Sequence, residues 1–244
     1  MKVAVYWGCL IPTIQYGYEM SVRAVMPRLG VELADLDNVS CCGTPVQSVN
    51  MPAALYLAAR NLALAEKTGL GNLLLPCNGC YLSLSEAKHL LSQDEKLKEE
   101  VNTTLKEEGL RYEGSIKIWH TISLLHDLVK EEKMREAVRR PLEGLKLAVH
   151  YGCHVLRPST LQTVDDPENP RKMDELVRWL GAESTPYPEK LDCCGAMLLL
   201  SHPDAAFTFS GLKMKAVQDL GADAFVVSCP SCQMMFDMRQ KSAA

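Results

Sequence analysis

The chain opens with Val3-Ala4-Val5-Tyr6-Trp7-Gly8-Cys9, and its pattern returns as Leu147-Ala148-Val149-His150-Tyr151-Gly152-Cys153. Both stretches combine an apolar run, two larger ring-bearing residues, one glycine and one cysteine. An apolar run that contains β-branched residues is typical of a buried strand. Each stretch therefore predicts a strand that leads into a cysteine at its carboxyl end, and the chain contains two copies of this unit.

The cysteines extend this repeat along the 244-residue chain. Each half holds one single cysteine, then a Cys-Cys pair, then a Cys-x-x-Cys, and the step from the pair to the Cys-x-x-Cys is 35 residues in both halves. The second half has eight extra residues before its pair, which we assign to a surface loop in the polar stretch 165–170. Internal duplication explains this pattern most simply. The ten cysteines are Cys9, Cys41, Cys42, Cys77, Cys80, Cys153, Cys193, Cys194, Cys229 and Cys232.

Helical patterns lie between the predicted strands, at residues 18–29, 53–67 and 173–180. Alternating strands and helices predict an α/β fold, with two pseudo-symmetric, Rossmann-like half-domains built on parallel sheets at residues 1–143 and 144–244. Ligands of such sheets collect at the carboxyl ends of the strands. All five cysteines of a half are therefore expected to converge there, with each Cys-x-x-Cys at a strand-to-helix turn. Residues 116–120 predict one further strand in the first half, so either the sheet of the second half is one strand shorter or a C-terminal piece is missing from this sequence.

Composition excludes several classes of function. The formal net charge is -4, with no long run of one sign, which argues against a nucleic-acid partner. The apolar runs are too short for membrane insertion, and the first residues do not resemble a secretory signal, so we expect a cytoplasmic protein. The chain has no glycine-rich nucleotide-binding motif, so its reductant is expected to come from a partner.

Ten cysteines in such a protein indicate metal binding or redox chemistry, because thiol buffers keep structural disulfides rare in the cytosol. A structural zinc ion and an ordinary four-iron cluster each need four ligands, so five thiols per half leave a surplus. The surplus favours a larger iron–sulfur cluster. Zinc, disulfides and inert buried thiols are the alternatives.

The cysteine pattern resembles the duplicated cysteine-rich, or Cys-Cys-Gly, domain of the catalytic B subunit of heterodisulfide reductase. The likeness extends to Cys77-Asn78-Gly79-Cys80-Tyr81 and to Val149-His150-Tyr151-Gly152-Cys153-His154, and covers essentially the whole chain. The resemblance implies one noncubane [4Fe-4S] cluster in each half, held by the five cysteines of that half. It also implies an oxidoreductase that cleaves a disulfide between the two clusters.

The resemblance also implies partners and a substrate. Electrons would arrive from a small iron–sulfur electron-transfer subunit and a flavin-containing iron–sulfur subunit, and the substrate in methanogens would be the mixed disulfide of coenzyme M and coenzyme B. Bulky residues at 197–200 stand where that family tends to have glycines, which favours a different disulfide or a bacterial heterodisulfide-reductase-like complex. The alternative function is an electron-relay subunit of another redox complex, without a disulfide substrate of its own.

Four residues near the cysteines are candidates for other roles. His150 and His154 flank Cys153, and either could donate a proton to a product thiolate or bind a cluster sulfur. Arg157 could pair with an anionic group of the substrate, and Tyr81 could line the substrate pocket. The competing expectations are packing or second-layer hydrogen bonding for the histidines, a solvated surface arginine, and a core tyrosine.

Overall fold

The computed structural model describes residues 1–161 and 164–243, which form two compact units. The first unit contains Met1–Thr121, and the second contains almost all of the remaining chain. Both units are α/β structures with parallel sheets, as the strand–helix alternation predicts. Among the described residues, no helix combines the length and the apolar composition needed to cross a bilayer.

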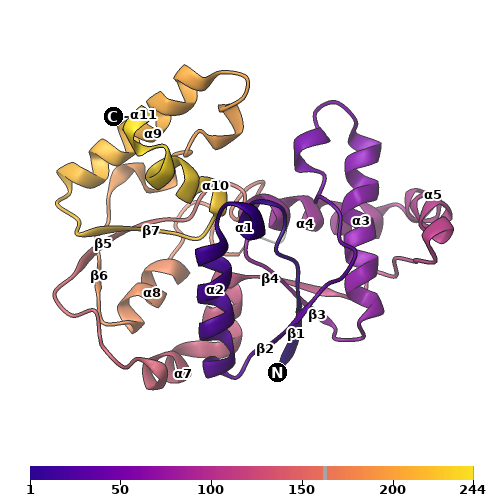
Figure 1. The fold of residues 1–244 in the computed structure, drawn as a ribbon, viewed down its shortest axis with the longest axis horizontal. Coiled ribbons are helices and arrows are strands. Elements are labelled where there is room, and N and C mark those ends of the chain that lie inside the picture. The colour runs from indigo at the N-terminus through magenta and orange to yellow at the C-terminus, as the bar shows by residue number, and fades with distance from the viewer. Residues whose placement is uncertain (162–163, 244) are drawn as a thin grey trace. The chain divides into compact units, whose positions relative to one another are not determined.

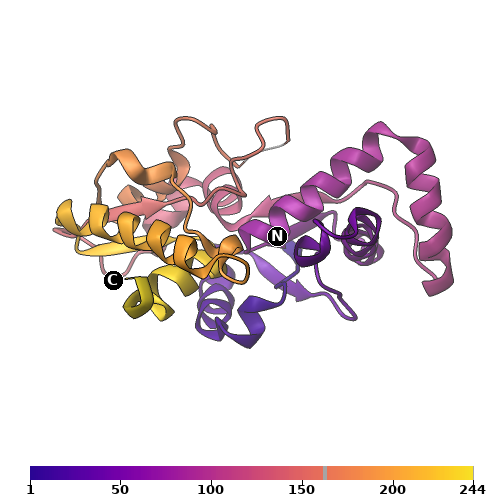
Figure 2. The same cartoon turned by 90° about the horizontal axis from the view of Figure 1, so that it is seen from above.

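The first unit is built on a four-stranded parallel sheet with the order β2-β1-β3-β4 (Figure 1). Its central strands are buried because neighbouring strands pair with both of their edges and helices cover the sheet. The strands are β1 (Lys2–Val5), β2 (Glu32–Asp35), β3 (Asn72–Leu75) and β4 (Lys117–His120). The helices are α1 (Leu10–Thr13), α2 (Tyr16–Val25), α3 (Met51–Lys67), α4 (Asn78–Gln93) and α5 (Glu95–Leu105), and α4 and α5 follow one another as a bent pair (Figure 2).

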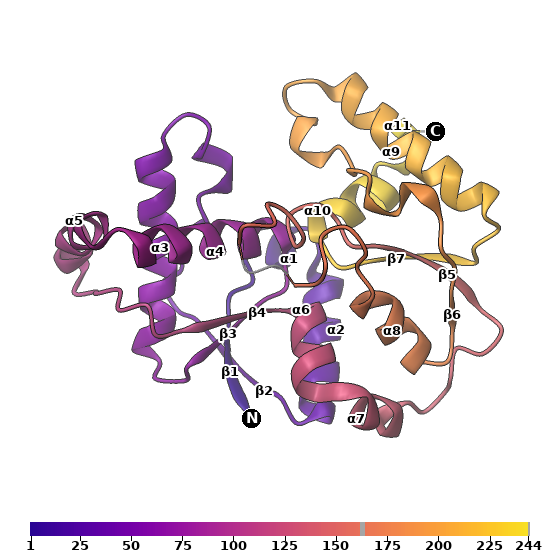
Figure 3. The ribbon, with the colours of Figure 1, turned by 180° about the vertical axis from the view of Figure 1, so that it is seen from behind.

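The second unit repeats this plan with a three-stranded parallel sheet of order β6-β5-β7. Figure 3 shows its strands between α8 on one side and α9 on the other. The strands are β5 (Lys146–His150), β6 (Glu183–Ser184) and β7 (Ala224–Val227). The helices are α6 (Thr121–Ser123), α7 (Lys130–Ala137), α8 (Lys172–Trp179), α9 (Pro203–Asp219), α10 (Pro230–Gln233) and α11 (Gln240–Ala243), with π-helical segments η4 (Leu124–Val129) and η7 (Met234–Met238).

The absence of a fourth strand changes the burial of β7. In the described part of the second unit no strand occupies the place of β4, as the sequence predicts, so β7 pairs only with β5. We expected residues 224–228 to form a buried strand, but most of β7 is only half-buried. The reason is that β7 is an edge strand, whereas β3 is covered on both edges.

The packing boundary between the units falls at Thr121, whereas the sequence repeat predicts a division at residue 143. The segment after Thr121 packs on α8 of the second unit, where His126 stacks on Trp179 with ring centroids 4.9 Å apart. His126 Nε2 also lies 2.8 Å from Glu175 Oε2, and Lys172 Nζ lies 2.6 Å from Asp127 Oδ2. The division of the repeat at residue 143 remains a prediction.

Candidate functional site: two five-cysteine sets

The first unit brings its five cysteines together at the carboxyl end of its sheet. Cys9 follows β1, and Cys77 is the N-cap residue of α4 directly after β3, as expected for a strand-to-helix turn. The thiols of Cys41 and Cys80 each hydrogen-bond to Cys42, Cys80 also bonds to Cys77, and the charge of Cys9 acts on Cys41. All five are free thiols in the structure. The convergence predicted for this half is therefore present.

The second unit repeats the arrangement with its own five cysteines. Hydrogen bonds connect Cys153 to Cys193, Cys193 to Cys194, Cys194 to Cys232 and Cys232 to Cys229 in one chain. The Sγ atoms of Cys194 and Cys232 lie 3.4 Å apart, although all ten cysteines are free. The five thiols, joined by these hydrogen bonds, form one set of sulfur donors.

Each set favours a thiolate on one of its members. In the first set, hydrogen bonds from Cys41 and, more weakly, from Cys80 lower the pKa of Cys42. In the second set, hydrogen bonds from Cys153 and, more weakly, from Cys194 lower the pKa of Cys193. The same bonds raise the pKa of the donors Cys41 and Cys153. Further ionisation inside one set accumulates negative charge in a partly buried volume. A bound cation or metal cluster would relieve that repulsion.

Buried polar side chains hold the backbone of the first Cys-Cys pair. Asn61 on α3 has no exposed surface; its Oδ1 accepts the Ser40 N–H at 3.0 Å, and its Nδ2 donates to the Cys41 carbonyl at 3.1 Å. Ser83 on α4 donates its hydroxyl to the Cys42 carbonyl. In the second unit Ser210 on α9 donates to the Cys194 carbonyl at 2.6 Å. Side chains from helices therefore hold the backbone of both Cys-Cys pairs.

Replacing Asn61 with leucine is expected to reduce both stability and iron loading of the first unit. The change removes the amide of Asn61, to which the Ser40 N–H and the Cys41 carbonyl hydrogen-bond. We expect the free energy of unfolding to fall by about 2–4 kcal/mol. Asn102→Leu is the matched control, because Asn102 holds the backbone of Tyr112 through both amide atoms but is remote in the chain from any cysteine. Urea unfolding should show a loss in both variants, and iron analysis should show a loss only in Asn61→Leu. Equal iron loss in the two variants would contradict the proposal that Asn61 holds the first Cys-Cys pair in place for iron binding.

Tyr6 and His150 occupy matching places in the repeat, and the sequence interpretation overlooked Tyr6. Tyr6 is buried and donates its hydroxyl to the Ser40 carbonyl at 2.7 Å, while burial and the nearby Cys80 and Cys42 strongly raise its pKa. His150 is buried with Nε2 3.3 Å from Cys232 Sγ. The alignment of the two opening stretches was the signal that could have found Tyr6.

His150 is suited to hydrogen bonding with a sulfur. Burial first, and the charge of Lys213 second, lower its pKa to about 3, so its imidazole is neutral near pH 7. Its ring also packs edge-on against Phe236, with centroids 5.0 Å apart. These contacts favour sulfur binding and packing over proton donation. One His150 nitrogen and the Sγ atoms of Cys194 and Cys232 all lie within 4.8 Å of one another, so the imidazole is also placed to ligate a metal.

The other candidates lie in different surroundings. His154 is partly exposed in the turn after Cys153, and its role as proton donor remains a prediction. Arg157 is exposed, with its guanidinium 3.7 Å from Glu168, which is the geometry of a surface arginine. Tyr81 is buried with its ring edge-on to His120 at 5.7 Å, so its contact is with the core. Substrate roles for Arg157 and Tyr81 remain predictions.

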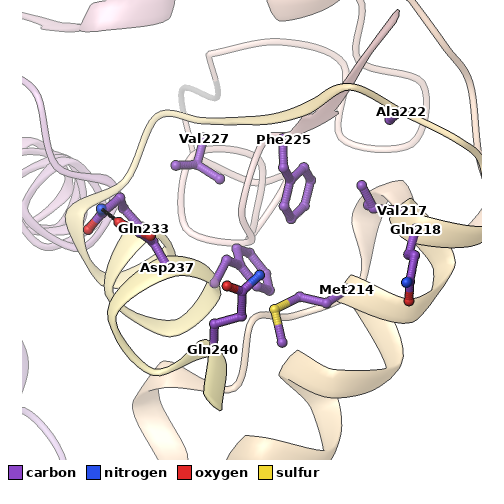
Figure 4. A pocket seen from close by; sticks show the side chains of 10 residues that line it. Met214, Val217, Gln218, Ala222, Phe225, Val227, Gln233, Asp237 and Gln240 are labelled. Carbon is purple, nitrogen blue, oxygen red and sulfur yellow. Dashed lines mark hydrogen bonds between the residues drawn. The ribbon is translucent and has the colours of Figure 1, made fainter. Parts of the chain in front are cut away.

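A pocket of about 490 Å³ lies between β7, α9 and η7 in the second unit (Figure 4). Phe225 and Val227 of β7 face it, with Met214 of α9 opposite. None of the residues that line it is a cysteine. The pocket therefore does not open onto a sulfur donor, although Phe236 in its wall packs in one cluster with Cys194, Cys229 and Cys232.

The two sets fit a thiophilic metal cluster. Both consist of five sulfur donors, and no carboxylate of the described residues joins them in a group of potential metal ligands. A Cβ added to Gly8 would lie 2.7 Å from Cys80 Sγ, so the backbone approaches the donors closely. Five converging donors exceed the four of a single zinc ion. Iron–sulfur clusters are therefore the better match to the donor set.

Fold and sites together define a protein with a duplicated CCG cysteine-rich domain. The family model described as "Cysteine-rich domain" matches twice, at residues 3–85 and 147–237. The chain is 36% identical over 243 residues to the B subunit of the ferredoxin/F(420)H(2)-dependent CoB-CoM heterodisulfide reductase of Methanosarcina acetivorans, covering 98% of this chain and 80% of that protein. The chain belongs to the family of heterodisulfide reductase B subunits.

Two further likenesses show how widely this architecture is used. The 8-methylmenaquinol:fumarate reductase membrane anchor subunit of Wolinella succinogenes is 33% identical, with 99% of this chain and 84% of that protein covered. A crystal structure of a hypothetical protein from Helicobacter pylori superposes with a TM-score of 0.76 at 18% identity, over 99% of this chain and 44% of that one. The second likeness shows the fold alone.

Proposed function

We propose that this chain is the disulfide-reducing subunit of a multi-subunit redox complex, with one noncubane [4Fe-4S] cluster held by each five-cysteine set. The observation that supports this most directly is that both sets are complete and converge in the same way. The clusters, when bound, would supply the two electrons that split a disulfide. With two protons, these electrons convert the disulfide into two thiols.

The protein's own residues prepare these sites for catalysis. Asn61, Ser83 and Ser210 hold the backbone of the paired cysteines, so the donors are in place without large rearrangement. His150 presents a neutral imidazole nitrogen to Cys232. Hydrogen bonds to ligand sulfurs tune the potential of an iron–sulfur cluster, which is the role we assign to this contact.

The proposed partners follow from what the chain lacks and from the names of its relatives. No nucleotide-binding glycine motif occurs in the sequence. We assign electron delivery to a small iron–sulfur subunit and a flavin-containing iron–sulfur subunit. The substrate class is a disulfide such as the mixed disulfide of coenzyme B and coenzyme M, which the name of the Methanosarcina relative specifies for that protein.

The second candidate is an electron-relay subunit without a disulfide substrate. The Wolinella relative supports it, because its name assigns it to a fumarate reductase. Disulfide turnover by the intact complex distinguishes the two candidates.

Metal analysis is the first test of the proposed function. Anaerobically purified protein is expected to contain about four irons and matching acid-labile sulfide per half, because five thiolates exceed the needs of zinc. Iron, sulfide and zinc are measured on the same sample. Zinc alone, without sulfide, would overturn both redox candidates.

A further inference from the structure

Lys213 is a buried cation beside the second cysteine set. It lies on α9 with 1% of its surface exposed, and its Nζ donates to the carbonyls of Glu189, Lys190 and Asp192 at 2.5, 3.0 and 2.9 Å. These three carbonyls belong to residues 189–192, which immediately precede Cys193. Lys213 therefore fixes the approach to the second Cys-Cys pair from inside the protein.

The hydrogen bonds themselves identify the charged form of this side chain. Three carbonyl oxygens accept from one nitrogen, and only the ammonium form has three N–H donors. Burial lowers the pKa of Lys213 to about 8, which still leaves it protonated at neutral pH. No carboxylate of the described residues forms an ion pair with it. The charge of Asp192 acts on it most strongly, followed by the charges of Cys232, Cys194 and Cys193.

The first unit has a neutral residue in the same place. Helices α3 and α9 are both 17 residues long, and a Cβ on Gly43 or Gly195 would meet the backbone of Ala54 or Ala206 in the same way. Asn61 stands seven residues after Ala54, and Lys213 stands seven residues after Ala206. Seven residues are about two helical turns, so both side chains lie on the same face of their helices.

Asn61 and Lys213 therefore perform the same structural task with different charge. Both hold the segment around a Cys-Cys pair, Asn61 through Ser40 and Cys41 and Lys213 through the residues before Cys193. The charges of Cys232, Cys194 and Cys193 act on the Lys213 ammonium group, whereas the amide of Asn61 is neutral. One asymmetry between the sets is therefore a buried positive charge beside the second set.

We propose that Lys213 positions the second cysteine set and that its buried charge makes a cluster held there easier to reduce than a cluster held by the first set. The proposal rests on the proposed function in that each set holds a cluster. Reduction adds one electron and so one negative charge, and a fixed cation in a low-dielectric site stabilises the reduced form. The second cluster would then accept the first electron from the donor.

The test is a stepwise anaerobic titration of the holoprotein with dithionite, followed by EPR. Dithionite gives one electron to each cluster, and no bond of the protein forms or breaks. Cys42→Ser and Cys194→Ser assign the two signals by removing one set at a time. The expected result is that the second cluster has at least a tenfold larger equilibrium constant for reduction, which is about 59 mV for one electron. Equal potentials, or a higher potential for the first cluster, would overturn the proposal.

Variants of Lys213 separate its charge from its shape. Lys213→Gln is expected to lower the equilibrium constant for reduction of the second cluster at least tenfold, or to lose that cluster, whereas Lys213→Arg retains both the cluster and its potential. Equal behaviour of the two variants would overturn the proposal. Lys88→Gln is the control, because Lys88 is a half-buried lysine that donates to the Ile116 carbonyl, and no cysteine is among the main influences on its pKa. It should change neither signal.

Failure of this inference can be distinguished from failure of the proposed function. Two clusters whose potentials do not follow Lys213 would overturn the inference alone. Potentials that follow Lys213, without disulfide reduction by the intact complex, would overturn only the disulfide-reducing assignment. Wild-type protein without iron and sulfide would overturn both.

Discussion

Cys194→Ser is expected to abolish disulfide reduction by the intact complex. Cys194 is buried in the middle of the second set, with hydrogen bonds to Cys193 and to Cys232, so serine removes a central sulfur donor. Residues that act as one unit lose nearly all activity when a single member is removed, and we expect a fall of at least about 10³-fold in kcat. Steady-state turnover of the disulfide, with iron analysis of the same sample, measures the effect.

Cys42→Ser provides the matched experiment in the first set. Cys42 is buried and central among its neighbours, as Cys194 is in the other unit. Each single variant should lose about half of the iron and keep the other cluster as an internal control for folding. The double variant should be no slower than either single variant, because both clusters serve one reaction. Near-normal disulfide turnover with one cluster missing would refute the proposal that the disulfide is cleaved between two clusters.

Gly195→Ala is expected to destabilise the second unit by about 3 kcal/mol or more and to prevent cluster loading. Gly195 follows the Cys193-Cys194 pair with φ +79, and its added Cβ would lie 2.5 Å from the Ala206 carbonyl oxygen. Left-handed strain and an overlap with backbone each cost about 1–3 kcal/mol. Urea unfolding of the apoprotein and iron content after reconstitution measure the two effects.

Gly221→Ala is the control in the same unit, because it introduces left-handed backbone strain without a steric overlap. Gly221 has φ +69, but nothing lies within 4 Å of an added Cβ there. This variant should show only the conformational cost of about 1 kcal/mol and load iron normally. If Gly195→Ala were no worse than Gly221→Ala, the close approach of the Cys-Cys loop to α9 would not matter for the site.

The repeat makes much of the fold and site predictable from local sequence. Apolar runs that end at a cysteine correctly predict β1, β3 and β5, and the Cys-x-x-Cys motifs do begin helices α4 and α10. The strand–helix alternation predicts the parallel sheets, because parallel strands need crossover helices. Convergence of five cysteines in each half follows from that topology, since the carboxyl ends of parallel strands share one edge.

Features that depend on distant contacts were not predictable in the same way. The half-burial of β7 depends on a missing neighbouring strand, and the boundary at Thr121 depends on the packing of His126 and Trp179. The repeat marks Tyr6 as the counterpart of His150, but only the fold brings its hydroxyl to the Ser40 carbonyl. Burial and pairing of this kind are properties of the folded chain and leave little local signal.

The number of sulfur donors and their grouping into two sets can be read from residue identity and spacing alone. The electrostatics of each set depends on the folded chain. Asn61 and Lys213 are ordinary helix positions in sequence, but folding buries the neutral amide and the charged ammonium group beside a Cys-Cys pair. The effect of a charge depends on its burial and its distance from other groups, and packing between elements far apart in the chain sets both.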